Sequence, residues 1–263
     1  MKTVFLFDVD GTIVNSGQKI TTEMAIILNN LKKKKNIEIG IVGGGKLDKI
    51  LEQMDDKIFF NHYFTECGCV YHENCATNDS LDLMPIYTKN IRDHKLYTPI
   101  NLLIKHCLQY LSKVDYTITG HFIDLRHGII YVSLIGLTAN ETERATFMEL
   151  DKTNNYRTQL LESLVKKATD LGIENQVAIV EGGSVGIAIY PSEWDKIQIL
   201  DYFPDRNYEK IYYFGDKYKP NGNDHLILNH PRVEGFPVDH YQDTIETLRK
   251  FLAYYILISY LPH

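Results

Sequence analysis

The sequence is poor in cysteine, has no excess of basic charge and contains no hydrophobic run long enough to cross a membrane. Its 28 Lys and Arg face 34 Asp and Glu, which leaves a formal net charge of -6. Because a phosphate backbone is bound by a broad basic surface, we expect no nucleic-acid partner. Four cysteines in 263 residues are too few for a disulfide scaffold and lack the spacing of common zinc sites. Free thiols in a reducing, cytoplasmic compartment are therefore expected.

Both ends of the chain lack the segments that would direct it to a membrane. The N-terminus does not read as a signal peptide, because Asp8 falls within what would be its apolar region. The longest apolar run, from Phe251 to Leu261, has about 11 residues, whereas roughly 20 are needed to span a bilayer. We expect this run to be a helix packed on the core, with an interfacial helix or a subunit contact as the alternative. No membrane partner is expected.

Strand and helix patterns alternate in the N-terminal part of the chain. The apolar run TVFLF leads into Asp8, an amphipathic helix is predicted from Thr21 to Lys35, the apolar run IEIGIV follows, and a second helix is predicted from Leu47 to Met54. The same alternation resumes near the C-terminus, with a helix from Lys196 to Phe203, the strand KIYYFGD and a closing helix from Thr244. This order predicts an α/β fold with a parallel sheet flanked by helices.

The middle of the chain has a different pattern. The polar, turn-rich residues 72–85 read as a linker. They are followed by a helix from Ile100 to Leu111, two alternating β segments, a polar helical stretch from Glu141 to Lys167 broken near Asn154, and the β-prone run VAIVEGGSVGIAIYP. We therefore predict an α/β core domain of residues 1–82 and 189–263 into which an α+β domain of residues 83–188 is inserted.

The motif DVDGT at residues 8–12 carries the strongest chemical signal. Two carboxylates follow a buried strand, and strand alternation alone would send Asp8 and Asp10 to the same side. Like charges held close together favour a divalent cation, and this pattern suits phosphoryl transfer with one Asp as nucleophile, the other as acid and base, and Mg²⁺ on the phosphate. Gly11 permits a sharp turn, and Thr12 can offer its hydroxyl or N–H to the phosphate.

Three further segments supply groups that such a site needs. Asp216 follows a second strand, and Asn223 and Asp224 precede a helix, so their oxygens can complete a Mg²⁺ site with Asp8 and Asp10. Lys196 can neutralise a phospho-aspartate. Gly44 and Gly45 lie before a helix, where backbone N–H groups can hold a phosphate. Taken one by one, these residues would more often be a helix cap, a solvated lysine and a simple turn; following DVDGT, they predict a site.

These motifs, in this order and spacing, resemble the eukaryotic phosphomannomutases of the haloacid dehalogenase superfamily. The resemblance rests on FDVDGT, GIVGGG, HFIDLRHGIIYVSLIG, ELDK, EWDK and GDKYKPNGND and covers about residues 2–250. It implies a Rossmannoid core with an inserted cap domain, a homodimer formed through the caps, Mg²⁺, a small phosphorylated sugar as substrate and a hexose 1,6-bisphosphate activator. It assigns Asp8 as nucleophile and Asp10 as acid and base, with Lys196, Asp216, Asn223 and Asp224 as supporting groups.

The sequence departs from this family mainly where the substrate is held. An arginine that helps to bind substrate is replaced by Gly17, and of three cap arginines that hold the distal phosphate only Arg126 and Arg144 remain, with Leu137 at the third position. The serine and aspartate that hold sugar hydroxyls are replaced by Gly186 and Ala188, which have nothing to offer a hydroxyl. A serine of the phosphate loop and a second cation site, at His230 and Val233, also look lost.

Three functions follow from this combination. The overall resemblance favours a mutase that interconverts mannose 6-phosphate and mannose 1-phosphate through a phospho-aspartate on Asp8. The lost substrate contacts favour a phosphatase that hydrolyses a sugar or nucleoside monophosphate on the same fold. A binding protein without activity is the third alternative, and the retention of Asp8, Asp10, Lys196 and Asp216 speaks against it. We expect the mutase.

Overall fold

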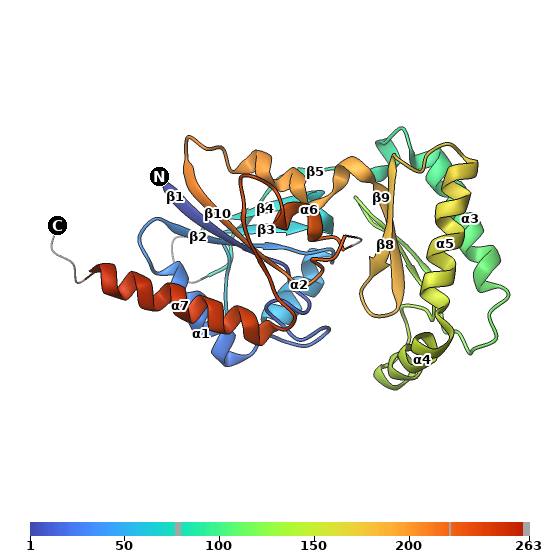
Figure 1. Ribbon diagram of the computed structural model, residues 1–263, viewed down its shortest axis with the longest axis horizontal. Helices are drawn as coiled ribbons and strands as arrows, with labels where there is room; N and C mark the ends of the chain where they lie inside the picture. The colour runs from blue at the N-terminus through green and yellow to red at the C-terminus, as the bar shows by residue number, and fades with distance from the viewer. Residues whose placement is uncertain (77–79, 221, 260–263) are drawn as a thin grey trace. The chain divides into compact units, whose positions relative to one another are not determined.

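A computed structural model describes residues 1–76, 80–220 and 222–259 of the chain (Figure 1). It divides into two compact units, one made of Met1–Thr88 with Lys196–His263 and the other of Lys89–Asp195. We call the first the core unit and the second the inserted unit. Within the described residues, no helix combines the length and the apolar character that a membrane crossing requires.

The core unit is built on one seven-stranded sheet in the order β11-β10-β1-β2-β3-β4-β5. Its parallel strands are β1 (Lys2–Phe7), β2 (Ile37–Val42), β3 (His62–Thr65), β10 (Tyr208–Gly215) and β11 (Glu234–Pro237). The antiparallel strands β4 (Val70–Asn74) and β5 (Leu83–Thr88) complete one edge. The central strand β1 is an apolar run buried from Thr3 to Phe7, as expected for a strand covered on both faces. The α/β class and the parallel sheet are therefore as predicted.

Helices cover both faces of this sheet. The helices α1 (Thr22–Lys32), α2 (Leu47–Met54) and α7 (Tyr241–Ser259) enclose an apolar cluster that includes Phe5 and Ile39. The 3₁₀ helix η4 (Lys196–Tyr202) and α6 (His225–Leu228) enclose a second cluster on the other face, around Leu6 and Phe64. The two clusters alternate along β1 because successive strand residues point to opposite faces. Figure 1 shows α1 and α7 lying next to each other along the sheet.

The last helix packs on the core, as predicted, over the part whose side chains are described. The Phe251 ring lies 5.2 Å from Phe5, 5.0 Å from Tyr212 and 5.6 Å from Phe236, measured between ring centroids. These edge-to-face contacts anchor α7 against β1, β10 and β11. The side chains of residues 256–263 lie outside the description, and with them the rest of the predicted apolar run.

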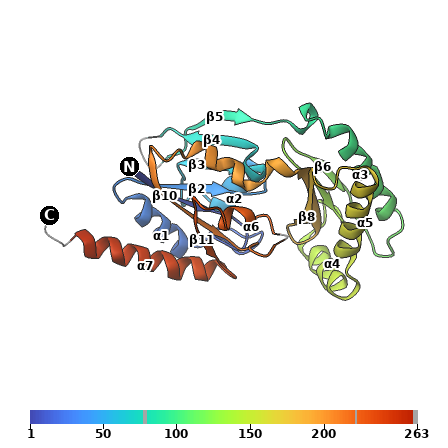
Figure 2. The ribbon, with the colours of Figure 1, turned by 45° about the horizontal axis from the view of Figure 1, so that its top comes forward.

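The inserted unit has an antiparallel sheet in the order β6-β7-β9-β8. Its strands are β6 (Ile123–Leu125), β7 (Ile130–Ser133), β8 (Val177–Gly182) and β9 (Gly186–Pro191), and its helices are α3 (Tyr97–Leu111), α4 (Glu141–Asn154) and α5 (Tyr156–Asp170). Figure 2 shows α3 and α5 side by side against the sheet. The break expected near Asn154 lies at Asn155, whose φ of 57° ends α4 before α5 begins.

The stretch predicted to be a linker, residues 72–85, instead contributes to the core sheet. Its first residues belong to β4 and its last to β5, which pair with each other at the edge. The described residues of these strands within the stretch, 72–74 and 83–85, are half-buried or exposed, so they carry no buried apolar run for a pattern to detect. The unit boundaries accordingly fall after Thr88 and Asp195. The predicted boundaries, 82 and 188, would cut through or next to β5 and β9.

Candidate active site

Three carboxylates meet where the parallel strands of the core unit end. Asp8 follows β1 and Asp216 follows β10, which are neighbours in the sheet, and the Asp8 N–H donates to the Phe214 carbonyl at 2.9 Å. Asp224 immediately precedes α6. Ligand oxygens of Asp8, Asp216 and Asp224 lie within 4.8 Å of one another. The sequence prediction that these residues converge at the carboxyl edge of the sheet is therefore confirmed.

Two glycines allow the carboxylates to approach this closely. Gly11 has a φ of +87°, and a Cβ at this position would lie 2.6 Å from Oδ2 of Asp216. A Cβ at Gly215 would lie 2.6 Å from Cγ of Asp224. Real Cβ atoms do not tolerate such contacts, so any other residue at either position would push a carboxylate out of the cluster.

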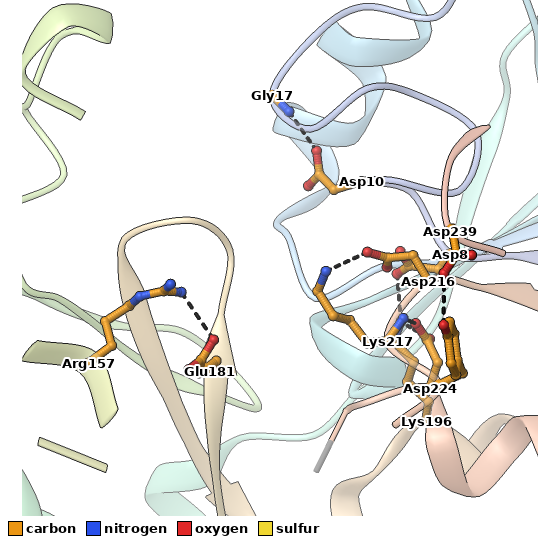
Figure 3. A network of polar contacts seen from close by, with 11 residues as sticks. Asp8, Asp10, Gly17, Arg157, Glu181, Lys196, Asp216, Lys217, Asp224 and Asp239 are labelled. Atoms are coloured by element: carbon orange, nitrogen blue, oxygen red, sulfur yellow. Dashed lines mark hydrogen bonds and ion pairs between the residues drawn. The ribbon is translucent and has the colours of Figure 1, made fainter. Parts of the chain in front are cut away.

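Lys196 is the positive charge at the centre of this cluster. Its side chain, at the start of η4, is 0% exposed, and Nζ donates to Oδ1 of Asp8 at 2.6 Å and to Oδ1 of Asp224 at 2.7 Å. Figure 3 shows the ammonium group between the two carboxylates. An ammonium buried this completely is stable only when it is paired and hydrogen-bonded. Lys196 therefore holds both carboxylates in place at once.

Asp224 has every side-chain oxygen engaged. Besides Lys196, its Oδ1 accepts a hydrogen bond from the Tyr213 hydroxyl at 2.5 Å, and its Oδ2 accepts one from the backbone N–H of Lys217 at 3.0 Å. Asp216 is bound on one side only, through the ion pair of its Oδ2 with Nζ of Lys217. The two residues are therefore held differently, although both look alike in the sequence.

Burial and mutual repulsion change how these groups ionise. Burial, together with the charges of Asp224 and Asp216, raises the pKa of Asp8 to about 8 against the opposing effect of Lys196. Burial also raises the pKa of Asp216, against the opposing effect of Lys217. Burial disfavours the charged form of Lys196, but the adjacent Asp224 and Asp8 outweigh it and raise the lysine pKa well above its usual value. The three carboxylates carry more negative charge than the ammonium groups of Lys196 and Lys217 neutralise.

Within the part of the chain that the structure describes, three buried oxygens beside this cluster have no hydrogen-bond partner. They are Oδ1 of Asp216, Oδ1 of Asn223 and the hydroxyl oxygen of Thr12. A buried polar atom without a partner is costly, so such atoms point to a ligand that they receive. Two of them are oxygens of the kind that Mg²⁺ prefers, next to excess negative charge, so the residues present fit a divalent cation. The Thr12 hydroxyl fits a phosphate oxygen.

Asp10 is turned away from the three carboxylates. Its Oδ1 accepts hydrogen bonds from the Gly17 N–H at 2.8 Å and from Nε2 of Gln53 at 3.0 Å, and its Oδ2 lies 3.8 Å from Nζ of Lys49 (Figure 3). Strand alternation does not apply to it, because β1 ends at Phe7. The sequence-based expectation that Asp8 and Asp10 share one side does not hold in this arrangement.

The glycine loop at residues 43–45 is fixed against the end of β3. The Gly43 N–H donates to the Phe64 carbonyl at 2.9 Å, while the carbonyls of Gly43 and Gly45 accept from the N–H groups of Cys67 and Glu66. The loop leads directly into α2, which has no side-chain cap at its N-terminus. Gly44 and Gly45 are thus held at the sheet edge where the carboxylates gather, as predicted.

The two arginines retained from the family pattern lie in the inserted unit. Arg126 donates from Nε to Oδ2 of Asp124 at 2.8 Å, and its guanidinium lies 5.0 Å from the centroid of the Tyr131 ring. Arg144 donates from Nε and Nη2 to the carbonyls of Ala139 and Leu137 at 2.9 and 3.0 Å. Since a guanidinium has five N–H donors, Arg144 can hold its loop and still bind an anion.

Several residues that shape the site escaped the sequence analysis. Gly17 was noted only as a missing arginine, yet its N–H, presented at a φ of +74°, holds Asp10. Gln53 reaches the same carboxylate from α2, and Tyr213 reaches Asp224 from β10. A polar residue in an otherwise apolar face of a helix or strand was the available signal. Gln53 and Tyr213 both fit this description.

Comparison with solved structures finds the same fold in two phosphate-releasing enzymes. The IMP-nucleotidase of Plasmodium falciparum matches with a TM-score of 0.65 and 14% identity over 95% of this chain and 62% of that chain. The C-terminal domain of the C. albicans trehalose-6-phosphate phosphatase matches with a TM-score of 0.61 and 14% identity over 96% and 93%. At these identities the likeness shows the fold alone.

Comparison of sequences is more specific. The model of the family described as eukaryotic phosphomannomutase matches residues 24–254. A phosphomannomutase of Encephalitozoon cuniculi is 33% identical over 92% of this chain and 91% of that protein, and a probable phosphomannomutase of Caenorhabditis elegans is 34% identical over 92% of each. Human phosphomannomutase 1 is 31% identical over 95% and 92%. The chain belongs to the eukaryotic phosphomannomutase family.

Proposed function

We propose that this protein is a Mg²⁺-dependent phosphomannomutase that interconverts mannose 6-phosphate and mannose 1-phosphate through a phospho-aspartate on Asp8. The observation that carries the proposal is the cluster of Asp8, Asp216 and Asp224 around the fully buried Lys196. Family membership supplies the reaction, and this cluster supplies groups suited to perform it.

Asp8, Asp216 and Asn223 are the residues that would hold the Mg²⁺ ion. Asp216 and Asn223 each carry a buried oxygen without a partner, whereas both oxygens of Asp224 are engaged by Lys196, Tyr213 and Lys217. We therefore assign Asp224 to the metal through water and to Lys196 directly. When bound, the ion supplies the positive charge that keeps carboxylates ionised and neutralises phosphate oxygens.

Asp8 forms the covalent intermediate. One of its carboxylate oxygens attacks phosphorus, the new P–O bond forms, and the bond from phosphorus to the sugar oxygen breaks. Lys196 holds Oδ1 of Asp8 at 2.6 Å, which orients the carboxylate and offsets its charge. The hydroxyl of Thr12 and the backbone of Gly44 and Gly45 receive the phosphate oxygens.

Asp10 moves the proton. It donates a proton to the sugar oxygen that leaves phosphorus and takes one from the sugar hydroxyl that attacks phospho-Asp8 in the second half of the reaction. Oδ1 of Asp10 accepts two hydrogen bonds, from Gly17 and Gln53. The transferred proton is therefore carried on Oδ2.

The second half of the reaction requires a sugar bisphosphate to be held in two orientations. Arg126 and Arg144 are the residues assigned to the phosphate distant from Asp8, since each is a guanidinium suited to a bidentate contact. A hexose 1,6-bisphosphate serves as the activator that first phosphorylates Asp8. The proposal also includes a homodimer formed through the inserted unit, a cytoplasmic location and a supply of mannose 1-phosphate for GDP-mannose synthesis.

Hydrolysis of a sugar or nucleoside monophosphate is the second candidate activity. Gly186 and Ala188, at positions where the family carries a serine and an aspartate, favour it, because neither can bind a sugar hydroxyl. A phosphatase needs only water after Asp8 has been phosphorylated, so it does not require a second orientation of the product.

The experiment that decides between them compares isomer formation with phosphate release over a panel of sugar and nucleoside phosphates. The assays contain Mg²⁺ and are run with and without hexose 1,6-bisphosphate. A phosphomannomutase converts mannose 1-phosphate into mannose 6-phosphate faster than it releases phosphate, and the bisphosphate accelerates this conversion. Phosphate release without isomer under all conditions would establish the phosphatase instead.

Chelation tests the metal separately. Because Lys196 does not neutralise all three carboxylates, we expect EDTA to abolish both activities and added Mg²⁺ to restore them. Mg²⁺ should also raise the melting temperature of the wild type, but not that of an Asp216→Asn/Asn223→Ala variant. Full activity in exhaustively chelated protein would contradict the metal assignment.

A further inference from the structure

One face of the inserted sheet carries a row of side chains that runs across its four strands. Asp124 on β6 lies opposite Tyr131 on β7, Tyr131 opposite Ala188 on β9, and Ala188 opposite Val180 on β8. Directly opposed residues of antiparallel strands share a face and contact one another. In this row Tyr131 is the large side chain, and its neighbours on β9 and β8 are small or apolar.

The Tyr131 side chain extends from β7 across β9 to β8 on this face. Its hydroxyl donates to the Gly182 carbonyl at 2.8 Å. A Cβ at Gly182 would lie 2.8 Å from Cε2 of the ring, and a Cβ at Gly186 would lie 2.5 Å from its Cζ and hydroxyl. The ring occupies the space that a side chain at 182 would need, and at 186 it shares that role with the Val132 carbonyl oxygen, which would lie 2.4 Å from a Cβ.

The other partner of the ring is Arg126. Its guanidinium carbon lies 5.0 Å from the ring centroid, within the range of a cation–π contact. Oδ2 of Asp124 accepts a hydrogen bond from Nε of Arg126 at 2.8 Å, and the arginine side chain is only 14% exposed. A long and flexible side chain is thus held by a ring on one side and by a carboxylate at its base. Both contacts are geometrically specific to arginine.

We propose that Tyr131 is a positioning residue that fixes the Arg126 guanidinium for binding the distal phosphate of the substrate. This inference rests on the proposed function, in which Arg126 binds that phosphate. It relates Gly182, Gly186 and Ala188 to one another: next to these small residues, this face provides an aromatic support for one arginine. The inserted unit then recognises its substrate through charge at Arg126, and the Gly186 and Ala188 positions add no hydrogen bond to a sugar hydroxyl.

The test compares two activities of the full-length protein with Mg²⁺ present. One is isomerisation of mannose 1-phosphate with hexose 1,6-bisphosphate, which needs the distal phosphate to be held. The other is hydrolysis of p-nitrophenyl phosphate, which has no distal phosphate and serves as the internal reference. We expect Tyr131→Leu to raise the KM for the bisphosphate at least tenfold and to lower the ratio of the two activities at least tenfold. Tyr131→Phe keeps the ring and should restore both values to within about threefold of the wild type.

Tyr116→Leu is the matched control. Tyr116 is also a half-buried tyrosine of the inserted unit, it also donates to a backbone carbonyl, that of Leu134 at 3.1 Å, and it packs on Phe147 and Tyr156 rather than on Arg126. A merely structural role of Tyr131 would give both leucine variants the same KM and the same activity ratio. That outcome would overturn the proposal.

Gly182→Ala provides a second variant that acts through the ring. Its new Cβ meets Tyr131 at 2.8 Å, while the nearest backbone atom is 3.3 Å away, so the ring must move. We expect the variant to raise the KM for the bisphosphate, and to have no further effect when it is combined with Tyr131→Leu. Additive effects of the two substitutions would contradict a shared action on Arg126.

Calorimetry separates a failure of this inference from a failure of the proposed function. Binding of hexose 1,6-bisphosphate to metal-free protein requires no turnover. If the wild type forms no isomer but binds the bisphosphate, the mutase assignment fails. The positioning role is still supported in that case if Tyr131→Leu binds the bisphosphate at least tenfold more weakly than Tyr116→Leu does. Equal affinities of the two leucine variants, or a wild type that does not bind the bisphosphate, would overturn it.

Discussion

A single lysine determines how the candidate site is charged. Lys196 is fully buried and shared by Asp8 and Asp224, so its charge can balance only one of them. Burial and the remaining negative charge raise the pKa of Asp8 to about 8, which would leave much of it protonated near neutral pH. The nucleophile that we propose must be ionised, and a divalent cation beside it would favour that form. The charges of the site therefore support the proposed metal.

Substitution of Asp8 tests its role as the nucleophile. We expect Asp8→Asn to lower both isomerisation and phosphoester hydrolysis by about 10⁴-fold or more, because an amide neither attacks phosphorus nor forms the intermediate. The matched control is Asp201→Asn, at an exposed aspartate of η4. Steady-state kinetics with Mg²⁺ measure both variants, and circular dichroism confirms that both are folded. More than about 1% residual turnover in Asp8→Asn would exclude it as the nucleophile.

Substitution of Tyr213 tests how much its hydrogen bond to Asp224, a partner of Lys196, contributes to stability. Its hydroxyl donates to Oδ1 of Asp224 in a fully buried position, and hydrogen bonds to charged groups contribute about 1.5 to 3 kcal/mol. We expect Tyr213→Phe to lower the free energy of unfolding of the metal-free protein by this amount. Tyr212→Phe, on the opposite face of the same strand, should cost less than about 0.5 kcal/mol. Urea denaturation of both variants measures the difference, and equal values would show that the Tyr213 hydroxyl contributes nothing.

At the residue scale, the sequence predicted which residues form the site better than it predicted the directions in which their side chains point. Asp8, Asp216, Asp224 and Lys196 converge as expected because each is attached directly to the end of a buried strand or to the start of a helix. Asp10 follows the strand by three residues and lies in a turn, where its direction depends on the Gly17 loop and on Gln53. Such contacts are set by the fold of distant segments, and no local pattern encodes them.

A second buried network joins four strands of the core sheet away from the carboxylate cluster. Oε2 of Glu38 on β2 interacts with Nε2 of His62 on β3 at 3.0 Å and accepts from the Tyr208 hydroxyl on β10 at 2.6 Å. Oε1 of Glu38 pairs with Lys2 on β1 at 2.5 Å. Burial alone would raise the pKa of Glu38, but these hydrogen bonds lower it to about 2. The Glu38 carboxylate therefore links the N-terminal ends of β1, β2, β3 and β10.

The pH dependence of stability tests this network. Because the pKa of Glu38 is about 2 in the folded protein and about 4.3 in an unfolded chain, its contribution is complete above about pH 5. It is lost as the pH falls toward 2. We expect Glu38→Gln to destabilise the protein by about 1.5 to 3 kcal/mol at pH 7, and this difference to shrink between pH 5 and pH 3. Urea denaturation at the three pH values measures it, and a difference independent of pH would assign the effect to packing.

At the element scale, the bounds of strands and helices were predicted correctly where apolar residues follow the regular spacing of a strand or a helix. The strand β2 and the helix α2 have the predicted bounds, since IEIGIV is buried on both faces and α2 is strongly amphipathic. Residues 72–74 of β4 and 83–85 of the edge strand β5 were read as part of a linker, because strand pairing holds them in the sheet and their side chains are not buried. The segment from Lys196 was expected to be a helix and is the 3₁₀ helix η4.

At the scale of the whole molecule, chemistry and recognition are assigned to different units. The core unit carries Asp8, Lys196 and the clustered carboxylates, and it contains the DVDGT motif on which the resemblance rests. The inserted unit carries Arg126 and Arg144, and its sheet has Gly186 and Ala188, whose side chains cannot form a hydrogen bond. Substitutions in the two units should therefore have different consequences. Those in the core unit should affect every phosphoester, whereas those in the inserted unit should affect substrates that carry a second phosphate.

The double variant Arg126→Ala/Arg144→Ala tests this division. If the protein is a mutase, both arginines hold the bisphosphate while it reorients, because Gly17 and Leu137 cannot replace them. Charge-assisted contacts of this kind predict a loss of about 2 to 6 kcal/mol in the transition state of isomerisation. Hydrolysis of p-nitrophenyl phosphate, which has no second phosphate, should lose much less. The control is Arg92→Ala, at an exposed arginine of the inserted unit, and both activities of this variant should resemble those of the wild type.

Equal losses of the two activities in the double variant would show that the arginines support the fold rather than the distal phosphate. A wild type that hydrolyses hexose bisphosphate without ever forming the isomer would instead favour the phosphatase.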